Sequence, residues 1–277
     1  VLSPNVGPMP VTIGRDVLRQ YYRFSLYNSP FPAHDEGCAI DLYPETATAP
    51  SPVAGEVVDT RTVRAPQKPY AADNDHLILV DTGSHIARLL HVKPGVEAGA
   101  TVEVGDPLGG LVRTGFFAPW VPNHVHLGFR ASGADPYRAS GSLPVSVDVP
   151  LVPVPWDGTG TVAEAGETWA VLDEPGHPDP GTVFAGLASD GGVLDGGFPH
   201  YSGGGLLAGG RRAVVGGRRV GTVSGRTVSW DECTVSANGG VVTGIALFCG
   251  RDRFGIKLVG RDLALSVGDA VDVSIDT

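Results

Sequence analysis

Glycine and proline interrupt this sequence so often that few stretches are long enough to form a helix. The 277 residues include 40 glycines and 23 prolines, which are unfavourable inside helices and frequent in tight turns. Between them stand short apolar runs such as CAIDLY (38–43), DHLILVDTG (75–83) and HVHLGFR (124–130). Runs of four to eight residues separated by turns are typical of strands. The sequence therefore predicts an all-β protein.

The pattern of strands and turns changes near residue 150. Up to about residue 130 the apolar runs alternate with turn signals, which indicates an antiparallel sandwich or barrel. The segment VPLVPVPWDGTG (149–160) is rich in proline and glycine, as expected of a linker. At roughly 150 residues per domain, the length suggests two domains. We expect residues 1–150 to form one domain and residues 151–277 to form a second, small β-rich domain whose role the sequence does not indicate.

Charge and cysteine content exclude several classes of protein. The formal net charge is -10, from 30 acidic and 20 basic residues, which argues against nucleic acid as a partner. No run of about 18 apolar residues predicts a transmembrane segment, and the opening VLSPNVGPMP does not resemble a signal peptide. Three cysteines are too few for a disulfide scaffold, although Cys233 and Cys249 are a candidate pair.

The stretch NHVHLGFR (123–130) places two histidines one residue apart on a predicted strand. Side chains alternate between the faces of a strand, so His124 and His126 share one face. Such a pair can be two solvated histidines on a surface strand, or it can supply at most two ligands of a zinc site. A zinc site takes three protein ligands and keeps one position open if it is catalytic. The other histidines before residue 150 are His34, His76, His85 and His91.

Four blocks of sequence, in order, resemble the LytM-type zinc metallopeptidases of peptidase family M23, the lysostaphin group. The blocks are HDEGCAIDLYP (34–44), SPVAGEVV (51–58), DHLILV to LVRTG (75–115) and NHVHLGFR (123–130), within a similar region of about 34 to 140. The resemblance implies an antiparallel β-sandwich or barrel of the duplicated-hybrid-motif type. It also implies a zinc-dependent endopeptidase that cleaves short peptide cross-bridges of peptidoglycan in the cell envelope or outside the cell.

The same resemblance assigns roles to five residues. His34, Asp41 and His126 would bind Zn²⁺, while His91 and His124 would be catalytic. Two imidazoles and one carboxylate leave a tetrahedral position free for water, whose pKa zinc lowers towards about 7. Nearby imidazoles can then transfer protons and stabilise the oxyanion on the attacked carbonyl.

Two departures from the family pattern bear on this assignment. Six residues separate His34 from Asp41 where the family usually has three, and Cys38 stands where the aspartate would be counted. A thiolate is a good zinc ligand, so Cys38 is an alternative third ligand. We favour Asp41, because AIDLY (39–43) keeps the apolar flanks of the family's aspartate strand. In addition, Leu90 stands before His91 where the family has a tyrosine.

The remaining polar and aromatic candidates have blander interpretations. We expect His76 and His85 to be solvated or structural, and Asp73 and Asp75 to form a solvated turn. His177 and His200 are expected in loops, where either could edge a substrate groove, and Trp120 is expected in the core or in a groove wall.

Two other functions compete with the peptidase. One is a non-catalytic or weakly active member that binds peptides or regulates a partner. The other is a lipoyl- or biotinyl-carrier-like module, which VKPGVEAGATVEVGDPLG (92–109) resembles, but the exposed lysine at a hairpin tip that such modules need is missing. The sequence does not indicate an oligomeric state.

Overall fold

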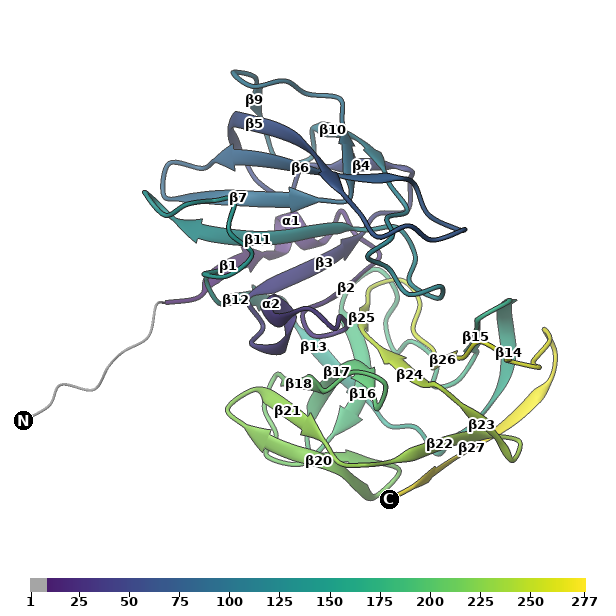
Figure 1. The fold of residues 1–277 in the computed structure, drawn as a ribbon. Helices are drawn as coiled ribbons and strands as arrows, with labels where there is room; N and C mark the ends of the chain where they lie inside the picture. The colour runs from purple at the N-terminus through teal and green to yellow at the C-terminus, as the bar shows by residue number, and fades with distance from the viewer. Residues whose placement is uncertain (1–8) are drawn as a thin grey trace, which may run out of the picture.

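The computed structural model describes residues 9–277 and consists of short strands with two one-turn helices (Figure 1). The prediction of an all-β fold is confirmed. Up to residue 148 the elements are β1 (Val11–Gly14), α1 (Arg15–Leu18), β2 (Arg23–Ser25), α2 (Pro32–Asp35), β3 (Ala39–Tyr43), β4 (Thr48–Pro50), β5 (Gly55–Arg64), β6 (Asn74–Asp81), β7 (His85–Leu90), β8 (Val92–Pro94), β9 (Thr101–Val102), β10 (Pro107–Leu111), β11 (Val125–Ala131) and β12 (Val145–Asp148).

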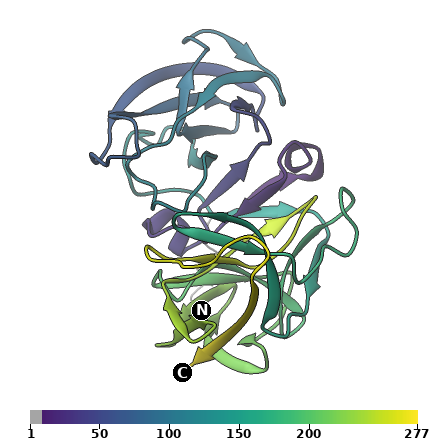
Figure 2. The same cartoon turned by 90° about the vertical axis from the view of Figure 1, so that its right-hand side faces the viewer.

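Residues 151–276 add fifteen further strands, which lie below the first set in Figure 1 and are seen from the side in Figure 2. They are β13 (Leu151–Val154), β14 (Thr159–Gly166), β15 (Trp169–Leu172), β16 (Phe184–Ser189), β17 (Gly192–Phe198), β18 (Gly203–Leu207), β19 (Ala213–Val215), β20 (Arg218–Ser224), β21 (Thr227–Trp230), β22 (Thr234–Ala237), β23 (Gly240–Val242), β24 (Gly244–Leu247), β25 (Cys249–Gly250), β26 (Lys257–Val259) and β27 (Ala270–Asp276).

One antiparallel ladder runs through the first half of the chain and continues into the second. Its order in space is β9-β5-β6-β7-β11-β3-β2-β25-β16. The step between the halves is short: Arg23 pairs with Gly250 and Phe24 with Cys249. A smaller sheet, β4-β10-β8, packs beside the ladder. Parallel pairing occurs between β1 and β12 and between β13 and β16.

Two hydrophobic clusters hold the strands together. The first gathers side chains of β2, β3, β6, β7 and β11, but it also contains Phe184, Val193, Leu207 and Cys249 from beyond residue 150. The second lies wholly within the later residues, around Phe198 and neighbouring strands. Because apolar burial is the dominant favourable term in folding, the first cluster depends in part on residues of the second half.

A buried carboxylate adds a polar connection between the halves. Asp195 on β17 accepts hydrogen bonds from the Ser25 hydroxyl at 2.5 Å, from the backbone N–H of Leu26 at 2.6 Å and from that of Tyr27 at 3.2 Å. Burial raises the pKa of Asp195 to about 6, although these three donors lower it. The chain that follows β2 is therefore fixed in place by a residue 170 positions away.

One glycine permits a close approach between two backbone segments. A Cβ atom at Gly115 would lie 1.7 Å from the carbonyl oxygen of Pro66. Only glycine fits there, and it lets the backbone at residue 115 lie against that of residue 66.

Among residues 9–277, neither helix is long and apolar enough to cross a membrane. All three cysteines are free thiols in this part of the chain, so the candidate pair Cys233 and Cys249 is not joined.

We predict that Asp195→Ala lowers the free energy of unfolding by about 2 to 4 kcal/mol, because it leaves buried backbone N–H groups and a hydroxyl without an acceptor. Urea unfolding measures this loss. Asp173→Ala is the matched control: Asp173 is exposed and accepts one backbone hydrogen bond, from Thr161, which water can replace. Equal midpoints for the two variants would contradict the structural role of Asp195.

Candidate metal centre

A cross-strand pair forms the base of the candidate site. On β11, His126 lies directly opposite Asp41 of β3 in the antiparallel register, and opposed residues point to the same face of a sheet. The Nδ1 atom of His126 is 3.0 Å from Oδ1 of Asp41. Asp41 itself is only 3 % exposed, because β3 lies between β11 and β2.

His34 reaches the pair from the one-turn helix α2, which begins at Pro32 in the favourable first helical position. Its ring is 1 % exposed. The Nδ1 atom lies 2.7 Å from the backbone carbonyl oxygen of Leu26. Since a carbonyl only accepts, Nδ1 carries the proton and Nε2 presents a lone pair to the site.

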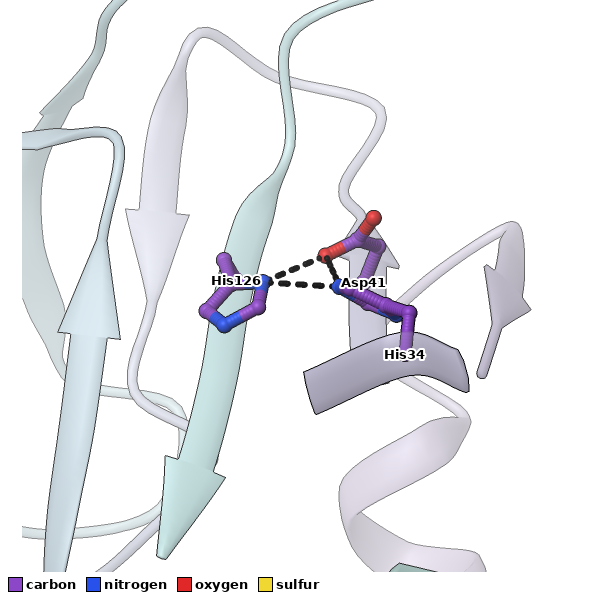
Figure 3. A group of neighbouring side chains, drawn as sticks. All are labelled: His34, Asp41 and His126. Atoms are coloured by element: carbon purple, nitrogen blue, oxygen red, sulfur yellow. Dashed lines mark hydrogen bonds and ion pairs between the residues drawn. The ribbon is translucent and has the colours of Figure 1, made fainter. Parts of the chain in front are cut away.

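Three ligand atoms converge in a way that suits a metal ion (Figure 3). Nε2 of His34 is 3.0 Å from Nδ1 of His126 and 3.4 Å from Oδ1 of Asp41. Ligands at the usual 2.0–2.2 Å from a tetrahedral zinc ion lie about 3.4 Å apart. Donor types and spacing therefore fit Zn²⁺ with one position left over, although other divalent ions accept imidazole and carboxylate too.

Two of the three ligands have the protonation states that metal binding requires, which are neutral imidazoles and an ionised carboxylate. Burial lowers the pKa of His126 to about 4. Burial alone would raise the pKa of Asp41, but His124 and His34 outweigh it and hold that pKa well below its usual range. Burial alone would lower the pKa of His34, but the charge and hydrogen bond of Asp41 outweigh it and raise that pKa, so a metal ion has to displace the proton of this imidazole.

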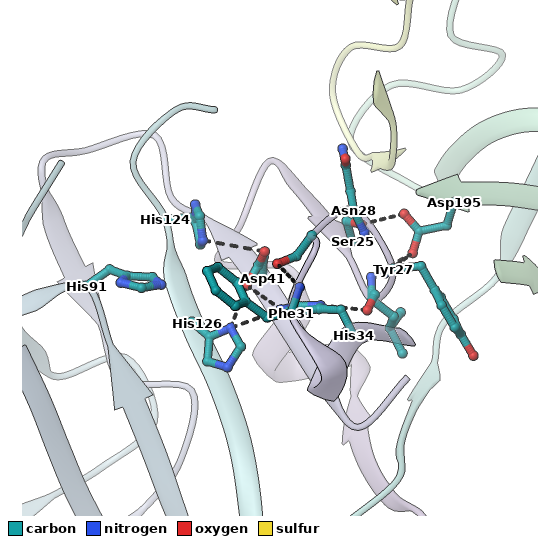
Figure 4. Close-up of polar contacts among 12 residues, drawn as sticks. Ser25, Tyr27, Asn28, Phe31, His34, Asp41, His91, His124, His126 and Asp195 are labelled. Carbon is teal, nitrogen blue, oxygen red and sulfur yellow. Dashed lines mark hydrogen bonds and ion pairs between the residues drawn. The ribbon is translucent and has the colours of Figure 1, made fainter. Parts of the chain in front are cut away.

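Two further histidines face the same region (Figure 4). Nδ1 of His124 donates to the Pro122 carbonyl oxygen at 2.9 Å, and its Nε2 is 3.4 Å from Oδ2 of Asp41. Burial lowers the pKa of His124 to about 3, so the ring is neutral. His91 follows β7 with a φ of 69°, a left-handed conformation that is rare outside glycine and costs energy.

A carboxylate holds His91 in this unusual conformation. Asp75 accepts from the backbone N–H of His91 at 3.1 Å and from its ring Nδ1 at 2.7 Å. Asp75 is fully buried. Burial raises its pKa, but the hydrogen bonds and charge of His91 outweigh this and lower it below its usual value. Nε2 of His91 is therefore left as the ring's second, reactive nitrogen.

Four of the five residues, Asp41, His91, His124 and His126, line one cavity of about 260 Å³. His34 lies next to this lining, with its Nε2 atom 3.0 Å from Nδ1 of His126. Apolar rings form much of the rest, with Phe117 stacked on His124 at 4.5 Å between ring centroids. A largely apolar pocket with a few converging polar groups is the usual form of a ligand site.

Comparison with known families covers nearly the whole chain. Residues 12–147 match the N-terminal domain of a family described as a domain of unknown function (DUF8155), and residues 152–276 match its C-terminal domain. The chain belongs to the DUF8155 family. No curated protein matches it by sequence.

Among solved structures, the DUF8155 chain has a weak likeness to the catalytic domain of the antimicrobial peptidase lysostaphin from Staphylococcus simulans. The two are 19% identical, with 44% of this chain and 88% of that domain covered, at a TM-score of 0.29.

The structure brings together all five residues singled out in the sequence, and it adds two. Asp75, expected in a solvated turn, is instead buried against His91, so that expectation is wrong. Tyr201, from the C-terminal half, lines the metal pocket. Burial and the charge of Asp41 raise the pKa of Tyr201 to about 12. No local sequence signal marks either residue, because both depend on long-range packing.

Cys38 does not join the cluster of potential ligands. Its nearest hydrogen-bond partner is the Glu36 carbonyl oxygen, at 3.8 Å from the sulfur. Burial raises the pKa of the Cys38 thiol, and Glu36 raises it further, so the thiolate that zinc prefers is disfavoured. His76 and His85 also lie outside the cluster, and His85 pairs with the Ser84 hydroxyl.

We predict one zinc ion per chain, retained by Cys38→Ser and lost from Asp41→Ala and His126→Ala. Removing one of three ligands leaves two, too few for a stable site. Elemental analysis of the purified proteins gives the metal content. Zinc loss in Cys38→Ser with retention in Asp41→Ala would show that the sulfur, and not the carboxylate, completes the site.

Proposed function

We propose that this DUF8155 protein is a zinc-dependent endopeptidase. The observation that carries the proposal is that a set of potential metal ligands and two further histidines lie side by side. Three ligand atoms lie 3.0–3.4 Å apart, and beside them stand two histidines, His91 and His124, whose Nδ1 atoms are engaged elsewhere. A structural zinc site uses four protein ligands and needs no such neighbours, whereas a catalytic site uses three.

The ligand set supports this reading. A zinc ion bound by His34, Asp41 and His126 would supply Lewis acidity, lowering the pKa of water towards about 7 and polarising a peptide carbonyl. The Leu26 carbonyl holds the His34 ring in the tautomer that leaves Nε2 free, as partners of metal-binding imidazoles commonly do.

His91 and Asp75 suit proton transfer. When Nε2 of His91 takes a proton, the ring becomes an imidazolium, and the Asp75 carboxylate 2.7 Å from Nδ1 stabilises that charge. The same N–H can then be donated to the leaving amine or to the oxyanion on the attacked carbonyl. The left-handed backbone at His91 turns the ring out of the ladder and into the cavity.

His124 has a different part in the proposed mechanism. Its low pKa makes it a poor proton carrier, but its neutral Nε2 accepts a hydrogen bond. We assign it to orienting the attacking water, beside Asp41, with Phe117 keeping its ring in place by stacking.

Peptide is the substrate class that the cavity and the motifs favour together. The cavity wall includes Phe31, Phe116 and Phe117, which suit a polymer with apolar stretches better than a small polar metabolite. The ordered motif blocks resemble peptidases that cleave cell-wall cross-bridges, so a short glycine-containing cross-bridge peptide of peptidoglycan is the substrate we propose to test.

We predict that His91→Ala and His124→Ala bind zinc normally but lose about 100- to 10,000-fold in turnover of a cross-bridge peptide, as expected for a removed proton-transfer or orienting group. Peptide cleavage is followed by chromatography, and zinc by elemental analysis. His85→Ala, a histidine outside the pocket, is the matched control and should behave as wild type.

Wild-type turnover by both pocket variants would refute the mechanism. A zinc-loaded wild type that binds but never cleaves such peptides would favour a non-catalytic peptide-binding protein instead.

We also predict that Asp75→Asn lowers turnover by about 10- to 100-fold, with zinc content unchanged. The amide keeps the size of the side chain but loses the negative charge that stabilises protonated His91, and partners that orient an imidazole typically contribute this much. The pH dependence of turnover distinguishes this role from a purely structural one, because loss of the Asp75 charge beside the proton-transfer group should shift that dependence. An unshifted profile with full activity would remove Asp75 from the mechanism.

A further inference from the structure

A second cavity, of about 720 Å³, lies where the two halves of the chain meet. This volume is typical of sites for organic ligands. Its lining includes two tryptophans, Trp120 and Trp169, and three basic residues that come from distant parts of the chain: Arg23, Arg113 and Lys257. Trp120, expected in the core or in a groove wall, thus forms part of a wall.

Arg23 is a buried charge without a counter-charge. Its guanidinium is packed against the rings of Tyr43 and Phe248, 4.2 and 4.6 Å from their centroids, and the residue is 9 % exposed. Among residues 9–277 no carboxylate lies within 4.0 Å of it. Its Nε atom is buried and has no hydrogen-bond partner. A buried, unpaired charge is costly, which calls for a compensating group.

Within residues 9–277, the hydrogen bonds of the Lys257 and Arg113 side chains all go to backbone carbonyls, and each cation also lies over an aromatic ring, that of Trp169 or Tyr70. Nζ of Lys257 donates to the Trp120 oxygen at 2.6 Å. The Arg113 guanidinium donates to the Val121 oxygen at 2.7 Å and to the Pro119 oxygen at 2.6 Å. Carbonyls satisfy hydrogen bonds but do not neutralise charge. Burial lowers the pKa of Lys257 well below its usual range, and the nearby charges of Arg23 and Arg113 lower it further.

The acidic residues of the same cavity are already engaged or exposed. Glu164 pairs with Arg253 at 2.8 Å, and Asp252 pairs with Arg251 at 2.7 Å. Asp173 is exposed and accepts the backbone N–H of Thr161. None of them lies within ion-pair distance of the three basic residues described above.

We propose that Arg23, Arg113 and Lys257 bind the carboxylate of a peptide in this second cavity. A planar guanidinium edge and an ammonium group recognise a carboxylate well. The aromatic walls favour an anion carried on an organic chain over a free inorganic ion. The three acidic residues that also line the cavity disfavour a multiply charged anion such as phosphate.

The position of the second cavity, next to the metal pocket, supports a peptide as its ligand. Val121 lines both this cavity and the metal pocket, so a chain held by its carboxylate beside Trp120 extends towards His124. The assignment to a peptide rests on the proposed function, whereas the assignment to a carboxylate rests on the three basic residues alone.

Isothermal titration calorimetry of the full chain tests the proposal. The probes are acetyl-tetraglycine with a free carboxylate, the same peptide as its C-terminal amide, and inorganic phosphate. We expect the acid to bind at least tenfold more tightly than the amide, as expected when charge-assisted hydrogen bonds are lost, and more tightly than phosphate. Lys257→Met and Arg23→Met should each reduce the affinity for the acid by about tenfold or more.

Arg253→Gln is the matched control, because Arg253 lines the same cavity but is already paired with Glu164, and it should bind the acid as wild type does. Equal affinity of wild type for acid and amide overturns the proposal, as does tighter binding of phosphate. A preference for the acid that survives in both Lys257→Met and Arg23→Met places the carboxylate elsewhere, such as at the metal, and also overturns it. Acid-selective binding without any peptide turnover would leave this site standing and refute the peptidase.

Discussion

The three-residue strand β2 is the constraint on which both candidate sites depend. It pairs with β3 on one side and with β25 on the other, so it is the strand through which the ladder passes from one half of the chain to the other. Arg23 at its start faces the second cavity. Ser25 at its end donates to Asp195, which also fixes the next two backbone N–H groups. The carbonyl of Leu26 then orients His34. A shift of β2 would displace a metal ligand and the basic cavity together.

The protonation states at the metal centre are set by burial and by one negative charge, that of Asp41. Asp41 is close to His34, His124 and His126, and removing such groups from water favours their neutral forms. The imidazoles of His124 and His126 accordingly stay neutral, while Asp41 remains ionised because several donors converge on it. In this arrangement the charge of Asp41 is balanced in part by His34, whose pKa is raised, chiefly by the charge of Asp41 against the effect of burial. When all the imidazoles are neutral, as metal binding requires, a divalent cation would supply the positive charge that the buried carboxylate needs.

The features that could be predicted from the sequence are those set by local rules of strand and turn geometry, and not those set by long-range packing. Alternation along a strand predicted that His124 and His126 share a face, and the cross-strand register then placed Asp41 beside His126. The long spacing after His34 has a local cause: α2 and the left-handed turn at Gly37 take up the extra residues.

Three other features depend on contacts distant in sequence, and no pattern in the chain signals them. Strand β2 pairs with β25 more than 220 residues away, and Asp195 reaches β2 across 170 positions. Asp75 is buried and bonded to His91, 16 positions away. The alternation of apolar and polar residues along a strand does not indicate such partners, since a contact between residues distant in sequence depends on the energy of the whole fold. The all-β class was accessible from glycine, proline and short apolar runs, while the joining of the two halves was not.

The segment from Pro119 to Pro122 links the two candidate sites physically. Its four successive carbonyls each accept a hydrogen bond from a side chain that lines a cavity: Arg113 for Pro119 and Val121, Lys257 for Trp120, and His124 for Pro122. The first three bonds come from the basic cavity and the fourth fixes the tautomer of a histidine in the metal pocket. Any change in the charge balance around Lys257 and Arg113 therefore acts on the same short backbone that positions His124. The two candidate sites therefore share one short backbone segment, and a change at either end of it bears on both.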